Sequence, residues 1–416
     1  MAYKPRVVDG ELRARLEATG AVVIEGPKAC GKTETARQVA RSEVLLDVDT
    51  NARAAAAIAP ETVLAGAVPR LIDEWQLAPE LWNHVRRAVD DRGRAGQFIL
   101  TGSAVPADDI TRHTGAARMT RLRMRPMSLF ETGHSTGAVS LTQLLAQGSG
   151  ACADPGLSIQ DIATRVAVGG WPSLQGHTEP QAMQAMRDYL DDIRRVDISG
   201  VDNVRRDPDR VGRLMASLAR NIATQVSIST LAHDASGTDE PMKNDTARAY
   251  LDALTRLMIV EDQPAWAPHL RSRSILRTAA KRHFVDPALA VAALRATPAR
   301  LLSEIKWFGF LFESLVVRDL RIYAQANDAV VRHYRDNTGL EVDAIVETAA
   351  GAWAAFEMKL GQGQVDEAAE QLLALSERVD TTVCGQPTTL AVVVATGFGY
   401  VRPDGVAVIP IGALAP

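Results

Sequence analysis

Runs of apolar residues alternate with helical stretches over the first hundred residues of the chain. Residues 21–25, 44–48, 68–74 and 97–101 are short apolar runs of the length and composition typical of buried strands. Residues 78–91, between the last two of these runs, repeat apolar side chains at helical spacing. Strands that alternate with helices predict a parallel sheet covered by helices on both faces.

From about residue 160 to residue 320 the pattern is mainly helical. Residues 227–235 predict a short helix, the loop 236–242 follows, and a stronger amphipathic helix begins at Asn244, a residue type that favours the N-cap. Residues 259–262 then have the pattern of a strand. Helix, turn, helix and hairpin is the order of a winged helix-turn-helix, so we expect a winged-helix element here.

The last quarter of the chain has a third pattern. A long amphipathic helix over residues 308–324 precedes three strand-like runs, which are followed by another helix and a last apolar strand. These five later elements are expected at residues 330–334, 341–347, 352–358, 366–379 and 389–395. The order predicts a compact α/β domain.

A stretch rich in Gly, Ser, Thr and Ala, residues 133–156, separates the alternating pattern from the helical one. This composition is typical of a linker. We therefore expect an α/β fold in three domains. A nucleotide-binding parallel sheet would cover residues 1–150, a helical region with the winged-helix element residues 151–300, and a small α/β domain residues 301–416.

Residues 26–33, Gly-Pro-Lys-Ala-Cys-Gly-Lys-Thr, match the phosphate-binding pattern G-x-x-x-x-G-K-[ST] between an expected strand and an expected helix. Glycines let backbone N–H groups surround phosphates, and the helix N-terminus adds its positive dipole end. Lys32 would reach the β- and γ-phosphates, and the Thr33 hydroxyl would bind Mg²⁺. We expect ATP to contact Gly26, Pro27, Lys28, Ala29, Cys30, Gly31, Lys32, Thr33 and Glu34.

Two adjacent acids end the expected strand at 68–74, in the sequence Leu-Ile-Asp-Glu. A nucleoside triphosphatase needs such a carboxylate to organise its magnesium ion. Asp73 would hold Mg²⁺ through water, and Glu74 would polarise the attacking water. Acids at a strand end are also common as charges before a helix, but the phosphate-binding loop upstream favours the catalytic interpretation.

Two more groups of residues, one with hydroxyl side chains and one of arginines, are candidates for contact with the nucleotide. Residues 97–103 end a strand with hydroxyl side chains, so Ser103 or Thr101 is a candidate sensor, although an ordinary Ser/Thr turn explains the pattern equally well. Arg118 and the arginines that alternate along residues 121–125 would supply a cation to a neighbouring subunit's nucleotide. That role requires a homo-oligomer, and surface ion pairing is its alternative.

Five motifs together resemble a known family: residues 23–33, 71–75, 99–103, 121–131 and 169–172. The most diagnostic are Arg-Pro-Met-Ser-Leu-Phe-Glu, which ends at Glu131, and Gly-Gly-Trp-Pro, which ends at Pro172. The chain resembles the prokaryotic AAA-type ATP-binding proteins that carry a C-terminal domain of unassigned function. The resemblance implies an AAA-like or STAND-like ATPase core, a winged-helix element and a nuclease-like fold at the C-terminal end.

A second chemical site is expected in the C-terminal domain, where Asp343 precedes the motif Glu357-Met-Lys359. This order resembles the PD-(D/E)xK nuclease core, in which Asp343 and Glu357 would hold Mg²⁺ and Lys359 would orient or deprotonate a water. Glu313, on the preceding helix, is a position where this fold often places another acid. The alternative is a cross-strand ion pair on a solvated face.

Charge excludes a global basic surface, because 46 Lys and Arg stand against 50 Asp and Glu, a net charge of −4. Only seven of the cations are lysine, so a lysine at a motif position is informative. DNA contact would depend on local patches. The candidates are Lys243, Arg248 and Arg256 near the expected recognition helix, and the cluster Arg271, Arg273, Arg277, Lys281 and Arg282. A solvated helix face explains them almost as well.

Three scattered cysteines and the absence of a long apolar run predict a cytoplasmic protein without a membrane segment. Three functions fit the sequence. The first is an ATPase that uses hydrolysis to remodel, move along or process DNA. The second is an ATP-gated regulatory switch whose C-terminal domain binds without cutting, and the third is a toxin-like or defence module with a nuclease-like effector.

Overall fold

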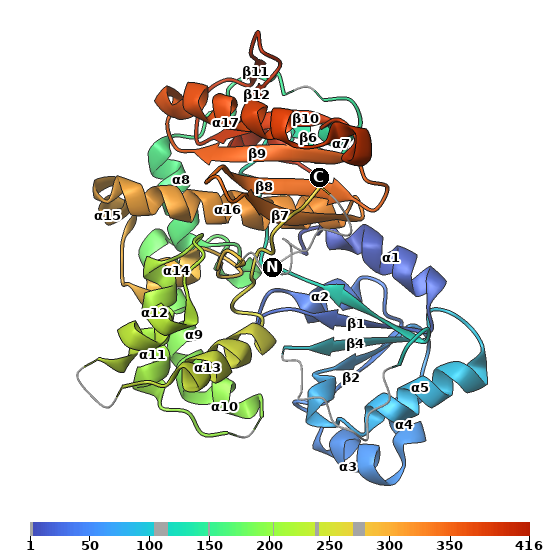
Figure 1. The fold of residues 1–416 in the computed structure, drawn as a ribbon. Coiled ribbons are helices and arrows are strands. Elements are labelled where there is room, and N and C mark those ends of the chain that lie inside the picture. The colour runs from blue at the N-terminus through green and yellow to red at the C-terminus, as the bar shows by residue number, and fades with distance from the viewer. Residues whose placement is uncertain (1–2, 104–114, 149, 203, 238–240, 269–278) are drawn as a thin grey trace.

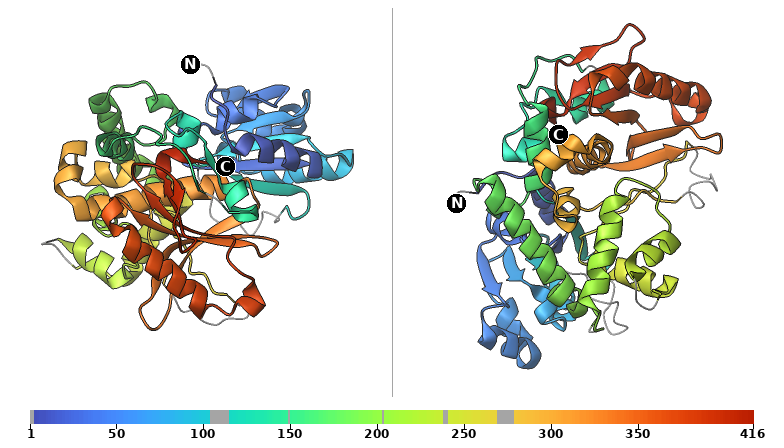
Figure 2. Two further views of the ribbon diagram at one scale, coloured as in Figure 1. Left: turned by 90° about the horizontal axis from the view of Figure 1, so that it is seen from above. Right: turned by 90° about the vertical axis from the view of Figure 1, so that its left-hand side faces the viewer.

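Figure 1 shows the computed structural model of the chain, which describes residues 3–416 except 104–114, 149, 203, 238–240 and 269–278. The described residues form two large sheets, of five and six strands, and a group of helices beside them (Figure 2). Over the same residues, no helix combines the length and the apolar character needed to cross a bilayer.

The five-stranded sheet contains β1 (Ala21–Glu25), β2 (Ser42–Leu45), β3 (Arg70–Asp73), β4 (Phe98–Gly102) and β5 (Met119–Arg123). Its order is β2-β3-β4-β1-β5, and every neighbouring pair is parallel. Val23 packs in a hydrophobic cluster on one face, and Val22 packs in a different cluster on the other. Burial on both faces confirms the predicted parallel sheet and explains why β1 is apolar almost throughout.

Helices α1 (Val8–Ala18), α2 (Lys32–Arg37), α3 (Thr50–Ile58), α4 (Pro60–Leu64) and α5 (Leu81–Arg92) accompany this sheet. Leu12 of α1 packs on the face that includes Val22, and Val85 of α5 packs on the opposite face. The strand expected over residues 44–48 ends earlier, at Leu45, because the side chain of Asp49 caps α3 by accepting a hydrogen bond from the N–H of Ala52.

The helical region contains α8 (Ile159–Val168), α9 (Glu179–Asp192), α10 (Ile198–Gly200), α11 (Pro208–Arg220), α12 (Ile228–Ser236), α13 (Asn244–Arg256), α14 (Ala288–Ala293) and α15 (Pro298–Ser303). A π-helical turn, Ile193–Asp197, continues α9. The two helices expected here are α12 and α13, but Lys243 rather than Asn244 is the N-cap of α13. After α13, Val260 and Gln263 make only isolated antiparallel bridges, to Phe284 and Lys281, so the winged-helix element stays a prediction.

The six-stranded sheet is mixed and contains β7 (Ala329–Arg335), β8 (Glu341–Thr348), β9 (Trp353–Lys359), β10 (Thr389–Val394), β11 (Tyr400–Val401) and β12 (Ala407–Pro410), in the order β11-β12-β10-β9-β8-β7. Strands β7 and β9 each pair antiparallel with β8, whereas β10 runs parallel to both β9 and β12. Helix α16 (Ile305–Gln325) packs on one face, and α17 (Val365–Arg378) packs on the other. The predicted α/β region is confirmed, and its nuclease-like character stays a prediction.

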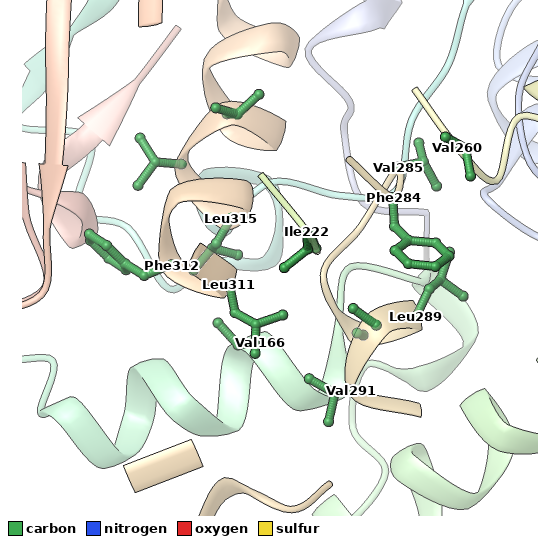
Figure 3. Close-up of a cluster of buried hydrophobic side chains, with 14 of the residues drawn as sticks. Val166, Ile222, Val260, Phe284, Val285, Leu289, Val291, Leu311, Phe312 and Leu315 are labelled. Carbon is green, nitrogen blue, oxygen red and sulfur yellow. The ribbon is translucent and has the colours of Figure 1, made fainter. Parts of the chain in front are cut away.

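One hydrophobic cluster joins the helical region to the six-stranded sheet. Leu311 of α16 lies next to Val166 of α8, and Phe312 and Phe284 belong to the same cluster (Figure 3). Helix α16 is therefore buried between the sheet and the helices along most of its length. The expected domain limit at residue 300 falls inside α15, and the three-domain division stays a prediction.

The Gly- and Ser-rich stretch 133–156, which was expected to be a linker, packs against the C-terminal sheet. It follows the short helix α6 (Leu129–Thr132) and contains β6 (Val139–Ser140) and α7 (Leu141–Ala146). Strand β6 pairs in parallel with β13 (Leu414–Ala415). The Thr389 hydroxyl also donates to the carbonyl of Leu144 at 2.7 Å. These contacts dock the stretch against the C-terminal sheet.

Candidate functional site

The phosphate-binding loop connects the end of β1 to the start of α2, as the motif predicted. Gly31, the residue before α2, has a φ of 105°, a value that disfavours any side chain. A Cβ on Gly26 would lie 2.3 Å from the carbonyl oxygen of Met124, so only glycine allows this close approach of two backbones. The loop conformation therefore depends on both motif glycines.

The ammonium group of Lys32 rests on the loop itself. Its Nζ donates to the carbonyl oxygens of Gly26 and Pro27, both at 3.0 Å, and the residue is 5% exposed. These partners are neutral, and charge-assisted bonds to phosphate are stronger than bonds to carbonyl groups. The ammonium group is thus positioned to exchange its carbonyl partners for phosphate oxygens.

The residues expected to organise magnesium meet at the same edge of the sheet. The Thr33 hydroxyl donates to Asp73 Oδ1 at 2.9 Å, and the Thr101 hydroxyl donates to the same oxygen. Asp73 ends β3, Thr101 lies in β4, and Thr33 is in the first turn of α2. Over the described residues, no three His, Cys, Asp or Glu side chains form a metal site by themselves, so an ion here would also need phosphate oxygens.

Glu74, the expected water-polarising residue, lies beside Asp73 with a left-handed backbone, φ 52°. Its Oε2 accepts hydrogen bonds from the Ser103 hydroxyl, at 3.2 Å, and from the Gln76 amide. The structure thus divides the two hydroxyl candidates: Thr101 contacts Asp73, and Ser103 contacts Glu74. Gln76 was missed by the sequence analysis because it lies outside the acidic motif.

The phosphate-binding loop also contacts the helical region. The Lys28 carbonyl oxygen accepts hydrogen bonds from Trp171 Nε1 at 3.1 Å and from the Tyr189 hydroxyl at 3.2 Å. The Lys28 ammonium group, largely exposed, pairs with Asp197 at 3.4 Å. The region after the sheet is therefore in direct contact with the phosphate-binding loop.

The two motifs that were most diagnostic of the family resemblance contact each other. The N–H of Met127 donates to the carbonyl of Gly170 at 2.7 Å, and a Cβ on Gly170 would lie 2.1 Å from the Met127 carbonyl oxygen. This backbone contact presents Trp171 to the phosphate-binding loop. The sequence contained the signal, Gly-Gly-Trp-Pro, but spacing alone did not show what it touches.

Arg118 is not brought to the phosphate-binding loop of its own chain. Its guanidinium group pairs with Asp90 at 2.8 Å, and its backbone carbonyl accepts from the N–H of Ala21, at the start of β1. The loop follows the opposite end of that strand. A role for Arg118 at a neighbouring subunit's nucleotide stays a prediction.

In the C-terminal sheet, Asp343, Glu357 and Lys359 are neighbours, as the nuclease-like pattern predicted. Glu357 Oε1 accepts from the N–H of Asp343 at 3.3 Å, and Lys359 Nζ pairs with Glu357 Oε2 at 2.9 Å. Asp343 Oδ2 accepts from the N–H of Met358 at 3.0 Å. Both expected metal ligands therefore already accept hydrogen bonds from within the chain.

A residue from outside the domain completes this cluster. Lys281 Nζ lies 2.7 Å from Glu313, 2.9 Å from Glu341 and 3.0 Å from Asp343. Lys281 is 2% exposed, so its expected contact with DNA is wrong: three carboxylates bury the ammonium group. The cluster opens onto a cavity of about 750 Å³ that Lys306, Arg335 and Lys359 also line.

Electrostatics fix the charge states of this cluster. Burial favours a neutral amine, but the carboxylates of Glu313, Asp343 and Glu341 outweigh it and hold the pKa of Lys281 well above its usual value. Burial, with the Asp343 charge, raises the pKa of Glu313 to about 8 and that of Glu357 well above its ordinary range. Asp343 keeps a lowered pKa because Lys281 and Lys359 outweigh its burial.

The other DNA-contact candidates are placed unevenly. Lys243 and Arg248 are exposed at α13, where Arg248 pairs with Asp245 at 3.0 Å. Arg256 donates to the Val201 carbonyl, and Arg282 pairs with Asp262. Arg271, Arg273 and Arg277 lie outside the described residues.

Three stretches of the chain match family models. Residues 18–133 match an AAA domain, residues 159–300 match a domain of unknown function (DUF8612), and residues 308–414 match another domain of unknown function (DUF4143). The first match spans the whole five-stranded sheet and its phosphate-binding loop. The N-terminal region is therefore an AAA-type ATPase-like domain.

Longer relatives have no assigned role. Two uncharacterised proteins, of Mycobacterium bovis and Mycobacterium tuberculosis, are each 24% identical to this chain over 368 residues, which cover 86% of this chain and 74% of theirs. Among solved structures, the Walker-type ATPase PABY2304 of Pyrococcus abyssi is similar at 14% identity with a TM-score of 0.42, covering 69% of this chain and 94% of that chain. The Orc1 protein of Aeropyrum pernix, solved with DNA, has 14% identity, a TM-score of 0.24 and coverage of 72% and 93%.

Proposed function

We propose that this chain is a Mg²⁺-dependent ATPase that binds DNA and couples ATP hydrolysis to remodelling, translocation or processing of that DNA. The observation that supports it best is the meeting of three elements at one sheet edge. The Lys32 ammonium group lies on the loop, Thr33 contacts Asp73, and Ser103 contacts Glu74. These are the groups that ATP hydrolysis requires.

In this proposal each group has one task. The backbone N–H groups of residues 28–33 and the ammonium group of Lys32 bind the phosphates. Thr33 and Asp73 would hold the magnesium ion, which neutralises phosphate charge when bound. Glu74 accepts a hydrogen bond from the attacking water and orients it, and Ser103 holds Glu74 in place. Trp171 and Tyr189 hold the loop from the helical region.

DNA binding is supported by exposed cations on α13 rather than by the net charge. The test is the ATP hydrolysis rate with and without duplex DNA over a range of salt concentrations. We expect stimulation that falls steeply with salt, because phosphate contacts release counterions. The double variant Lys243→Ala, Arg248→Ala should lower the salt slope by roughly 2 while basal hydrolysis stays unchanged. An ATPase rate that DNA leaves unchanged at every salt concentration contradicts DNA coupling.

We propose self-association as part of the same function, with Arg118 acting on a neighbouring subunit's nucleotide. Mixing two inactive variants tests it, because Lys32→Ala and Arg118→Ala subunits would together form interfaces that contain both intact residues. Recovery of hydrolysis on mixing supports the proposal, and no recovery in a verified mixed oligomer contradicts it. With Cys30, Cys152 and Cys384 all unpaired, we place this activity in the cytoplasm.

A second candidate function is an ATP-gated switch whose C-terminal domain binds a partner without cutting it. One observation favours it: of the two carboxylates expected to hold Mg²⁺ in that domain, Asp343 already binds Lys281 and Glu357 already binds Lys359. The metal does not fit beside this ammonium group, so we assign no cleavage step to Asp343, Glu357 and Lys359. Nicking of supercoiled DNA that is lost in Asp343→Asn would contradict the switch.

A further inference from the structure

The ammonium group of Lys281 has as many acidic partners as it has N–H donors. A lysine ammonium group has three N–H donors, and Lys281 has three carboxyl partners within 3.0 Å, on Glu313, Glu341 and Asp343. Two of these acids lie on β8 and one lies on α16, whereas the lysine comes from the stretch before α14. Three separate segments of the chain therefore converge on one positive charge.

The backbone of Lys281 is fixed as firmly as its side chain. Its N–H and carbonyl exchange hydrogen bonds with Gln263, at 3.0 and 2.8 Å. The Gln263 side chain is fully buried and donates from Nε2 to the carbonyl of Asp343 at 2.9 Å. The lysine and its carboxylate partner are thus held by one rigid frame, which sets the ammonium position.

A divalent metal at this cluster would compete for the same oxygens. Asp343 Oδ1 binds Lys281, and Oδ2 accepts from the Met358 N–H. Both oxygens of Glu357 are occupied as well, by the Asp343 N–H and by Lys359. A metal ion beside an ammonium group about 3 Å from the shared carboxylate would also meet strong repulsion between like charges.

We propose that Lys281 is the resident cation of the C-terminal carboxylate cluster and that it excludes divalent metals from it. Lys281 would thereby determine what the cavity can bind: a ligand that tolerates a fixed ammonium group, and not a metal-bridged phosphate. The inference depends on the C-terminal site and not on nucleotide turnover or DNA binding. It can fail while the proposed ATPase function stands, and the reverse is equally true.

The direct test is Mn²⁺ binding to the nucleotide-free full-length chain, followed by electron paramagnetic resonance. We compare the wild type with Lys281→Met, which removes the charged nitrogen and keeps an unbranched side chain. The control is Lys306→Met, at an exposed lysine that lines the same cavity. Lys281→Met should bind one Mn²⁺ at least about tenfold more tightly than the other two proteins. Adding Asp343→Asn to Lys281→Met should abolish that binding.

Two outcomes overturn the inference. One is wild-type Mn²⁺ binding that matches Lys281→Met and is lost in Asp343→Asn, because the lysine then excludes nothing. The other is a folded Lys281→Met protein that binds no Mn²⁺, because the cluster is then no cation site.

A second measurement needs no variant, since removing Lys281 leaves acids without a counterion and can unfold the chain. An amine-acylating reagent, read by mass spectrometry, should modify Lys281 at least about tenfold more slowly than the exposed Lys306. Millimolar Mn²⁺ should leave this protection unchanged. If Mn²⁺ makes Lys281 as reactive as Lys306, the metal displaces the lysine and the inference is wrong.

Discussion

Lys32 and Lys281 are both buried lysines, 5% and 2% exposed, yet their surroundings differ in kind. Lys32 donates to two backbone carbonyl oxygens of its own loop, and Lys281 donates to three carboxyl groups from two other elements, of which Asp343 has a lowered pKa. Carbonyl groups stabilise an ammonium group through their dipoles, whereas carboxylates also neutralise it. The positive charge of Lys32 therefore remains available to an anionic ligand, whereas acidic side chains of the same chain compensate the charge of Lys281.

This difference separates a site that can take up a ligand from one that is filled by the chain. An incoming phosphate offers Lys32 stronger partners than it has. Removing either member of a buried ion pair leaves an uncompensated charge and is costly, which keeps Lys281 in place. Burial of a lysine is thus uninformative about binding until its partners are known.

The largest effect is expected from Lys32→Ala. The phosphate-binding loop has two ammonium groups, and that of Lys28 is paired with Asp197. Loss of the Lys32 ammonium group should therefore lower the ATP hydrolysis rate by at least about 100-fold. Phosphate release measures it. Lys4→Ala removes an exposed lysine outside the loop and should stay close to wild type. A wild-type hydrolysis rate in Lys32→Ala would contradict the claim that Lys32, unlike Lys281, is available to bind phosphate.

Glu74→Gln should follow, with a fall in hydrolysis of about 100-fold and unchanged ATP binding. The amide keeps the shape beside Ser103 but no longer accepts the proton of the attacking water. Single-turnover hydrolysis and nucleotide binding by fluorescence separate the two steps. Glu80→Gln, an exposed acid on the same connection, is the matched control. Loss of ATP binding in Glu74→Gln would contradict the assigned role.

Glu313, one of the acidic partners of Lys281, should make the free energy of unfolding depend on pH. With a pKa of about 8, folded Glu313 keeps a proton that the unfolded chain loses near pH 4.5. The free energy of unfolding should therefore fall between these values as pH rises, by about 1.4 kcal/mol per pH unit from this group. Glu313→Gln resembles the protonated acid at every pH and should remove this slope. Urea unfolding at pH 5.5 and 7.5 compares the two proteins, and equal slopes would refute the prediction.

The smallest effect is expected from Trp171→Phe, which removes one hydrogen bond to the Lys28 carbonyl and keeps the aromatic ring. A single such bond contributes about 1 kcal/mol, so ATP should bind about fivefold more weakly. Trp266→Phe, in the C-terminal cluster of aromatic residues, is the control. An unchanged ATP affinity would show that the hydrogen bond from Trp171 does not contribute to nucleotide binding.

Local patterns were sufficient wherever the structure depends on neighbours in sequence. The apolar runs located β1 and β4 to within a residue, and the glycine spacing located the loop whose geometry Gly26 and Gly31 fix. Period-two alternation also placed Glu357 and Lys359 together on β9. In each case the determining physics is the backbone path of a few consecutive residues.

Lys281 is an example of a contact that local sequence patterns did not predict. In sequence it follows several arginines and resembles a surface cluster, but its side chain partners lie 32 and 62 residues away. Nothing in the run of cations indicates that one of them enters a group of acids. Trp171 is similar: its motif was visible, and its contact, 143 residues away, was not. Long-range pairing decides both.

The pairing of β6 with β13 has a consequence for how the chain is made. Ser140 and Pro416 share a hydrogen bond of 2.5 Å although they are 276 residues apart in sequence. During synthesis the AAA-type sheet can fold soon after residue 123 emerges, but residues 139–140 must wait for residues 414–415. Strand β6 therefore has no strand partner while the residues between it and β13 are being synthesised.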